Sequence, residues 1–222
     1  MHRHDLSYLR SGCHCRFLAG EPGPDLSAAV TAWIADERPL VVSRQDARAE
    51  QVQLALTLPA RLGRQRMTCL VNREDMLLTR PPLAVGDCLP RLGSRTRKVL
   101  ADLDATVLAS GARLGVFGSL AWEVLSGESY RHAESDIDLI CDLRSHRQLD
   151  DSLHALRTAS TRMTCRLDGE LRFPGGDAVA WRELAACRQR PAARVLVKGL
   201  YEVGLKPVAA LLDSLLAEPA HA

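Results

Sequence analysis

The sequence has few aromatic residues and no long apolar segment. Phe, Trp and Tyr make up 4% of its 222 residues although 46% are hydrophobic, so Leu, Val and Ala must fill the core. No run approaches the roughly 18 consecutive apolar residues of a membrane span. The amino-terminal MHRHDLSYLR lacks the apolar centre of a signal peptide, and no repeat or low-complexity tract is present. We therefore expect a cytoplasmic protein with one large or two small domains.

The seven cysteines follow neither a disulfide nor a zinc-binding pattern. Their number is odd and their spacing irregular, which predicts free thiols, several of them buried. Cys13-His14-Cys15 gathers soft-metal ligands, but its spacing matches no standard zinc site, so we expect none there.

The net charge of +2 conceals an asymmetry. Residues 1–98 hold 15 Lys and Arg against 10 Asp and Glu, whereas residues 99–222 hold 14 against 17. A basic half beside an acidic half suits an anionic substrate bound across both. For any single arginine, solvation of the surface is the more common role.

The stretch Val116–Asp142 combines two apolar strands with polar turns. Leu114–Phe117 reads as a strand, followed by a Gly-Ser turn and a short amphipathic helix over Leu120–Leu125. After a polar loop, Ser135-Asp-Ile-Asp-Leu-Ile enters a second apolar strand.

This stretch carries the residue types that phosphate chemistry requires. Asp136 and Asp138 are two residues apart, so on a strand both carboxylates point to one face, where they repel unless a cation such as Mg²⁺ lies between them. Gly118 permits close backbone approach, and Ser119 offers a hydroxyl beside the free N–H groups that begin a helix. A lone D-x-D is usually a solvated strand end and a lone Gly-Ser usually a turn. Their conjunction is much rarer and predicts phosphoryl or nucleotidyl transfer.

The arrangement of Gly-Ser and D-x-D resembles the polymerase-β-like nucleotidyltransferase superfamily. Within it, FGSLAWEVLSGESYRHAESDIDL is similar to the phosphoribosyl-dephospho-CoA transferases of malonate decarboxylase. The similarity extends to RHDLSYLR, WIADERPLVVSRQ, RLDGEL…AVAWREL and VLVKGLYEVGL, and so spans nearly the whole chain. Sixteen residues separate Ser119 from Asp136, more than in most members of the superfamily, so Gly127–Glu134 looks like an insertion.

The resemblance implies an α+β fold and a specific reaction. We expect a basic α+β module over residues 1–85 that binds substrate or carrier protein, then a nucleotidyltransferase domain over residues 86–222 with a mixed sheet and flanking helices. The donor would be triphosphoribosyl-dephospho-CoA and the acceptor a serine of the apo acyl carrier protein subunit of malonate decarboxylase. The implied cofactor is Mg²⁺, as two ions; nucleic acid and membrane are not expected partners.

A third carboxylate on a neighbouring strand completes the metal site in this superfamily. Asp168 is our choice beside Asp136 and Asp138, with Glu170 the alternative because it is so close in sequence. An Asp-Gly pair such as Asp168-Gly169 is also an ordinary turn signal.

Further polar residues are expected to contact substrate. The set comprises Gly118 and Ser119 on the donor phosphates, with Ser135, His132, Arg44 and Lys198 as additional contacts. A loop histidine such as His132 more often has no such role. Lys198 either binds phosphate from inside an apolar segment or reaches water at its end. Trp122 is expected in the core, and Trp181 and Glu183 have no assigned role.

Two other functions fit the same motif. One is AMP transfer from ATP to a small molecule or protein, because D-x-D does not distinguish donors. The other is a degenerate, non-catalytic binding module, which the retention of both carboxylates and of the Gly-Ser turn disfavours.

Outside the motif, residue patterns predict the remaining elements. We expect a helix over residues 26–37 capped by Asp25, a linker over residues 79–93, and a helix over residues 95–110 capped by Ser94. We also expect strands over residues 40–45, 51–58, 66–71, 162–167 and 170–173, a helix over residues 146–159, and a closing helix after Pro207.

Overall fold

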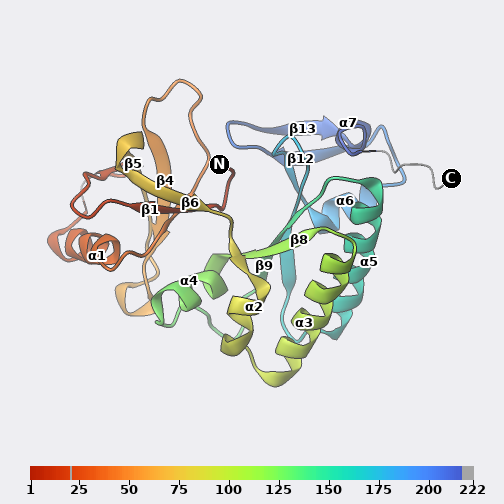
Figure 1. Ribbon diagram of the computed structural model, residues 1–222, viewed down its shortest axis with the longest axis horizontal. Coiled ribbons are helices and arrows are strands. Elements are labelled where there is room, and N and C mark those ends of the chain that lie inside the picture. The colour runs from red at the N-terminus through yellow and green to blue at the C-terminus, as the bar shows by residue number, and fades with distance from the viewer. Residues whose placement is uncertain (21, 217–222) are drawn as a thin grey trace. The chain divides into compact units, whose positions relative to one another are not determined.

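The computed structural model describes residues 1–20 and 22–216 (Figure 1). The chain forms two compact units. Unit 1 comprises Met1–Pro82, Trp122–Tyr130 and Leu200–Glu202, and unit 2 comprises Leu83–Ala121, Arg131–Gly199 and the chain from Val203 onward. The division of binding and catalysis at residue 85 stays a prediction.

Unit 1 is built on a six-stranded antiparallel sheet in the order β2-β5-β4-β3-β1-β6. Helix α1 packs on it, and its Val30, Trp33 and Ile34 join the strand side chains in one core. The elements are β1 (Leu6–Leu9), β2 (Arg16–Phe17), α1 (Pro24–Ala35), β3 (Leu40–Val42), β4 (Val52–Thr57), β5 (Arg66–Val71) and β6 (Met76–Arg80), with 3-10 turns at Ala60–Leu62 and Arg73–Asp75.

Two predictions in this unit have different outcomes. Trp122 is confirmed as core, since it is 7% exposed and its ring meets Trp33 edge-on with centroids 5.6 Å apart. Asp25 as helix cap is wrong, because the cap is Gly23 and Asp25 lies in the first turn. Pro24, which needs no N–H partner and has a helical φ, starts the helix two residues earlier than predicted.

Unit 2 contains a seven-stranded mixed sheet in the order β13-β12-β11-β10-β9-β8-β7. In the described chain, β9 and β10 are its one parallel pair. The strands are β7 (Leu83–Ala84), β8 (Arg113–Phe117), β9 (Ile137–Asp142), β10 (Leu167–Arg172), β11 (Ala178–Ala180), β12 (Arg194–Lys198) and β13 (Val203–Pro207). The helices are α2 (Val85–Cys88), α3 (Ser94–Ala109), α5 (His146–Arg162), α6 (Trp181–Cys187) and α7 (Val208–Leu212), with a 3-10 turn at Leu89–Arg91. Helix α4 (Gly118–Ser126) starts in this unit, and its residues from Trp122 onward belong to unit 1. This mixed architecture confirms the α+β class.

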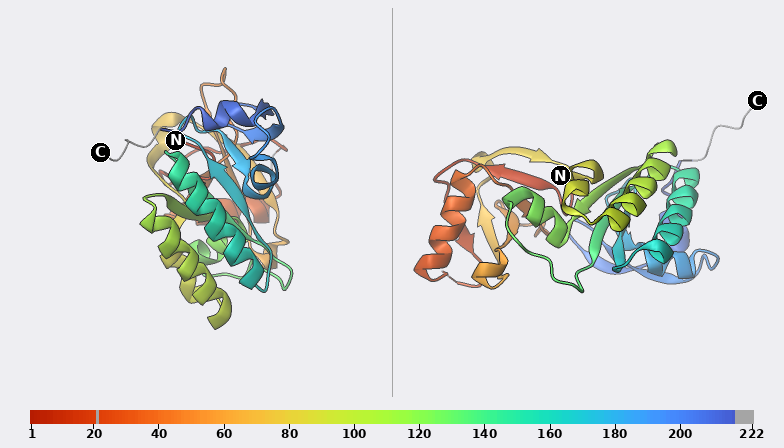
Figure 2. Two further views of the ribbon diagram at one scale, coloured as in Figure 1. Left: turned by 90° about the vertical axis from the view of Figure 1, so that its right-hand side faces the viewer. Right: turned by 90° about the horizontal axis from the view of Figure 1, so that it is seen from below.

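Helices α3 and α5 lie side by side on one face of this sheet (Figures 1 and 2). Cys141 of β9 contacts α5 there, with its Sγ 3.4 Å from Ser152 Oγ. Because side chains alternate along a strand, Asp138 and Ile140 point to the opposite face. That face carries the polar side chains described below.

Several predicted boundaries in unit 2 are wrong. The boundary between the units at Pro82 and Leu83 falls inside the predicted linker of residues 79–93, but the range is not irregular, because β6, β7, α2 and a 3-10 turn occupy most of it and β7 pairs with β8. Ser94 is the first helical residue rather than the cap, which is Gly93. Helix α5 continues to Arg162, so the strand expected over residues 162–167 starts only at Leu167.

The Asp168-Gly169 pair forms no turn but lies inside β10. Gly169 has φ 149°, and a Cβ there would overlap the Leu139 carbonyl oxygen and lie 2.9 Å from its carbon. This glycine is therefore needed for close approach of β10 to β9 rather than for a reversal.

Two composition-based predictions can be compared with the structure. All seven cysteines are free, and Cys69, Cys88 and Cys141 are buried, as predicted. In the described part of the chain, none of the helices has the length and apolar character needed to cross a bilayer.

Candidate active site

The Gly-Ser corner lies directly against one of the motif carboxylates. Strand β8 ends at Phe117, which pairs with Asp138 of β9, and Gly118 then starts α4 with φ 72°. A Cβ on residue 118 would overlap Asp138 Oδ2 and lie 2.9 Å from Cγ. Glycine is thus required both for its left-handed backbone and for space. Ser119 follows in the first turn of α4, where N–H groups lack helical partners and suit phosphate.

Asp136, Asp138 and Asp168 gather at one end of the β9–β10 pair. Asp138 and Asp168 are directly opposite each other in the parallel register, and Asp136 immediately precedes β9. Asp136 and Asp168 also share a cationic neighbour, because Arg166 Nη1 is 3.8 Å from Asp136 Oδ2 and Nη2 is 3.0 Å from Asp168 Oδ2. The structure therefore brings together all three predicted carboxylates and the Gly-Ser corner.

The environment of Asp138 disfavours its charged form. Burial raises the pKa of this carboxyl to about 6, and the negative charges of Asp168 and Asp136 add to the rise, while Arg166 opposes it. Within residues 1–20 and 22–216, Asp138 forms no ion pair of its own. A half-buried carboxylate near two others is a place where a cation would be stabilised.

Glu170, the alternative third carboxylate, has a different neighbourhood. It is 6% exposed, lies opposite Ile140 rather than Asp138, and its Oε1 accepts a 2.9 Å hydrogen bond from Lys198 Nζ. Lys198 is at the end of β12 with its side chain 36% exposed. The lysine thus reaches the same sheet face as Asp168 and compensates Glu170 there.

Ser135 and His132 form hydrogen bonds within the loop before Asp136. The His132 backbone N–H donates to Ser135 Oγ at 2.9 Å, and the Glu134 N–H donates to His132 Nδ1 at 3.3 Å. These bonds shape the turn into β9. The imidazole is exposed. Arg44 is an exposed residue of unit 1, after β3.

Sequence reasoning missed Arg166. Ile137 N donates to the Arg166 carbonyl at 3.0 Å, which aligns the starts of β9 and β10. Arg166 and Asp168 then point to the same face because they are two residues apart. The two-residue spacing of Arg166 and Asp168 could have indicated this, but the predicted strand over residues 162–167 ended before Asp168.

The carboxylates fit magnesium by their chemistry. All three offer only oxygen atoms, and Mg²⁺ prefers one or two carboxylates together with water and phosphate. Across the described residues, no three His, Cys, Asp or Glu side chains already form a group that could enclose an ion. One oxygen of Asp136 and one of Asp168 instead lie within 4 Å of the Arg166 guanidinium.

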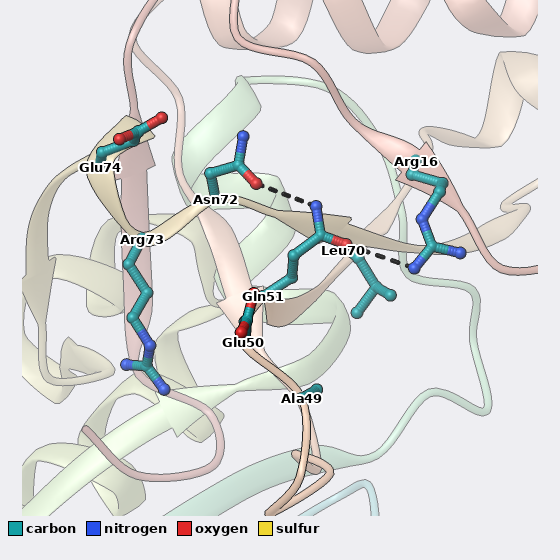
Figure 3. A pocket seen from close by; sticks show the side chains of 8 residues that line it. All are labelled: Arg16, Ala49, Glu50, Gln51, Leu70, Asn72, Arg73 and Glu74. Atoms are coloured by element: carbon teal, nitrogen blue, oxygen red, sulfur yellow. Dashed lines mark hydrogen bonds between the residues drawn. The ribbon is translucent and has the colours of Figure 1, made fainter.

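A separate cavity of about 690 Å³ lies in unit 1 (Figure 3). Figure 3 shows a chain of side chains across it, in which Arg16 donates to Gln51 and Gln51 donates to Asn72. Its charges balance, with Arg16 and Arg73 against Glu50 and Glu74. None of the predicted site residues lines it, so it adds nothing to the carboxylate site.

A mixed sheet with paired strand carboxylates beside a Gly-Ser helix start is consistent with a nucleotidyltransferase-like α+β fold. Comparison with protein-family models matches residues 2–82 to the phosphoribosyl-dephospho-CoA transferase MdcG N-terminal domain and residues 83–208 to its C-terminal domain. The chain belongs to this transferase family, which confirms the resemblance inferred from its motifs.

Curated relatives carry the same name. A phosphoribosyl-dephospho-CoA transferase of Xanthomonas euvesicatoria pv. vesicatoria is 32% identical over 94% of this chain and 95% of its own length. One from Xanthomonas campestris pv. campestris (strain 8004) is 33% identical over 88% of this chain and 89% of its own length. One from Bradyrhizobium diazoefficiens is 28% identical over 91% and 88%. No solved structure matches the chain.

Proposed function

We propose that this enzyme attaches the 2′-(5″-phosphoribosyl)-3′-dephospho-CoA group to a serine of the apo acyl carrier protein subunit of malonate decarboxylase. The family supports a CoA-derived substrate. The observation that carries the chemistry is the position of Asp138, which lies against the Gly118 backbone and opposite Asp168 and forms no ion pair with the described residues. A cation held by the carboxylates would then also contact a triphosphate held at the Gly118–Ser119 corner.

The transfer is a single displacement at phosphorus. The serine oxygen of the carrier protein attacks the α-phosphate of the donor, and the bond from that phosphorus to the bridging oxygen breaks. Pyrophosphate leaves, the hydroxyl proton passes to solvent, and a phosphodiester joins the prosthetic group to the carrier. In this proposal, the N–H groups at Gly118 and Ser119 bind the β- and γ-phosphates and hold the leaving group in line.

Asp136, Asp138 and Asp168 are the proposed ligands of two magnesium ions. Magnesium held there would lower the pKa of the attacking hydroxyl and neutralise the charge of the leaving pyrophosphate. Asp168 is preferred to Glu170 as the third ligand because Asp168 is directly opposite Asp138, whereas Lys198 compensates Glu170. Substrate contacts by Ser135, His132, Arg44 and Lys198 stay predictions.

Mass spectrometry of the carrier protein tests the function. Incubated with enzyme, Mg²⁺ and the triphosphate donor, the apo carrier should gain the mass of one phosphoribosyl-dephospho-CoA group. ATP in place of the donor should give no adenylylated carrier, and adenylylation from ATP alone would instead favour AMP transfer. No mass gain with the proper donor would refute the proposal.

Variants assign that activity to the carboxylates. Asp136→Ala and Asp138→Ala should each raise the activation free energy by about 4 kcal/mol and so lower the rate about a thousandfold, because each removes a proposed metal ligand. Asp151→Ala is the matched control, since Asp151 is an exposed carboxylate of α5 paired with Arg147. Near-normal turnover in either site variant would contradict the assignment.

A further inference from the structure

Arg166 lies beside two of the three proposed metal ligands. Its guanidinium lies 3.0 Å from Asp168 Oδ2 and 3.8 Å from Asp136 Oδ2, and its side chain is 59% exposed. The backbone of Arg166 is fixed by the 3.0 Å bond from Ile137 N to its carbonyl oxygen. A fixed backbone with a long, exposed side chain lets the guanidinium change partner without any rearrangement of the sheet.

We propose that Arg166 exchanges partners during loading: it pairs with Asp136 and Asp168 until a divalent cation takes their oxygens, and it then binds the polyphosphate of the donor. This inference rests on the proposed function for the identity of the donor. It assigns Arg166 two roles, as competitor of the cation and as phosphate ligand.

The competition follows from shared atoms. A magnesium ion sits about 2.0–2.1 Å from a carboxylate oxygen, and the guanidinium already contacts the same Oδ2 atoms of Asp136 and Asp168. Two cations on one oxygen repel each other strongly when partly shielded from water. Because Asp138 has no ion pair in the described structure and the three carboxylates outweigh one arginine, a divalent cation remains the stronger partner.

The second partner follows from strand order. Strand β9 lies between β8 and β10, so the Gly118–Ser119 corner at the end of β8 and Arg166 at the start of β10 flank the same end of β9. A polyphosphate bound at the corner and extending over Asp138 therefore approaches Arg166 from across β9. Guanidinium groups bind phosphate through two parallel hydrogen bonds, which an ammonium group cannot reproduce.

The test measures binding rather than turnover, with probes that do not depend on the natural donor. Isothermal titration calorimetry would follow Mg²⁺ binding, and then binding of preformed magnesium tripolyphosphate, to the wild type, Arg166→Gln and Arg166→Lys. Arg162→Gln is the matched control, because Arg162 is an arginine of the same unit paired with Asp102 outside the site. Thermal denaturation of each variant checks that it is folded.

The two affinities should move in opposite directions. Arg166→Gln should bind Mg²⁺ about threefold to tenfold more tightly, because a competing charge is gone, and magnesium tripolyphosphate about tenfold more weakly. Arg166→Lys should keep Mg²⁺ affinity near the wild type but still lose polyphosphate affinity. Arg162→Gln should change neither.

Unchanged or weaker Mg²⁺ binding in a folded Arg166→Gln would overturn the exchange, as would unchanged tripolyphosphate binding. The mass assay on the carrier protein is separate from this result. One outcome is that the carrier gains no mass while Arg166→Gln still binds Mg²⁺ more tightly and magnesium tripolyphosphate more weakly. In that case the proposed acceptor or donor is wrong and the role of Arg166 stands.

Discussion

Asp138 of β9 and Asp168 of β10 face each other across a parallel strand pair, on the sheet face away from α3 and α5. Burial of Asp138 and the charges of Asp168 and Asp136 together raise its pKa to about 6. Folding therefore places a carboxylate where its ionisation is unfavourable, a cost typical of sites selected for binding rather than for stability.

Removing the charge of Asp138 should stabilise the fold at neutral pH. The folded pKa of about 6 is above the ordinary 3.8, so the folded state holds the proton more tightly than the unfolded state does. The resulting penalty is absent below pH 3.8, grows between 3.8 and 6, and is complete above 6, where it amounts to at most about 3 kcal/mol.

Asp138→Asn should accordingly raise the melting temperature at pH 7.5 but leave it nearly unchanged at pH 4, without magnesium. Thermal denaturation at the two pH values measures this. Asp151→Asn, which changes a carboxylate of α5 outside the site, should shift neither value. An equal shift of Asp138→Asn at both pH values would mean that repulsion at Asp138 is not the cause.

Cation binding should weaken as the pH falls through about 6. Protonation of Asp138 removes a proposed ligand charge, so protons and Mg²⁺ compete for the same carboxylate. At low Mg²⁺ concentration, the transfer rate should fall on the acid side with a midpoint near the pKa of Asp138. That midpoint should move to lower pH as Mg²⁺ is raised. An acid limb independent of Mg²⁺ would show that another group titrates.

Gly118→Ala should impair both folding and transfer. The added methyl would overlap Asp138 Oδ2, and alanine disfavours the φ of 72°, so we expect a loss of about 1–2 kcal/mol from backbone strain together with a displaced carboxylate. Gly86→Ala is the control, because a Cβ there meets nothing within 4 Å and the residue lies in helix α2. Urea denaturation and transfer rates compare the two. A Gly118→Ala enzyme with normal rate and stability would contradict the close approach.

The central motif was predictable because its signals are local. An apolar strand, a Gly-Ser turn and a D-x-D strand fix β8, the start of α4 and β9, and strand periodicity alone puts Asp136 and Asp138 on one face. The register that sets Asp168 opposite Asp138 depends on contacts between strands, which residue patterns do not specify.

The errors have a common origin in tertiary contacts. Asp168-Gly169 carries a turn signal, but the glycine is needed because a side chain at this position would collide with the backbone of Leu139 on the neighbouring strand. Helix α5 runs to Arg162 and the strand after it begins at Leu167, so the boundary could not be read from an apolar pattern. Arg166 was missed for the same reason, since its partners became visible only once β10 was placed.

The sequence leaves Asp168 and Glu170 as alternatives for the third metal-binding carboxylate, and a binding experiment should distinguish them. Asp168→Asn should weaken Mg²⁺ binding at least about tenfold, because it removes a carboxylate beside Asp138. Glu170→Gln should leave Mg²⁺ binding within about twofold, because Lys198 rather than a cation compensates Glu170. Calorimetric titration with Mg²⁺ distinguishes them, and the reverse order would make Glu170 the ligand.

Lys198 can be tested against the same pair. Lys198→Met should destabilise the protein by about 1–3 kcal/mol, because it leaves the buried Glu170 carboxylate with weaker compensation. The double variant Glu170→Gln with Lys198→Met should recover most of that loss in urea denaturation. If Lys198 also binds the donor, the double variant should regain stability but keep a raised KM for the donor. Full recovery of KM as well would mean that Lys198 only balances the charge of Glu170. No recovery of stability would show that loss of the ion pair with Glu170 is not why Lys198→Met is less stable.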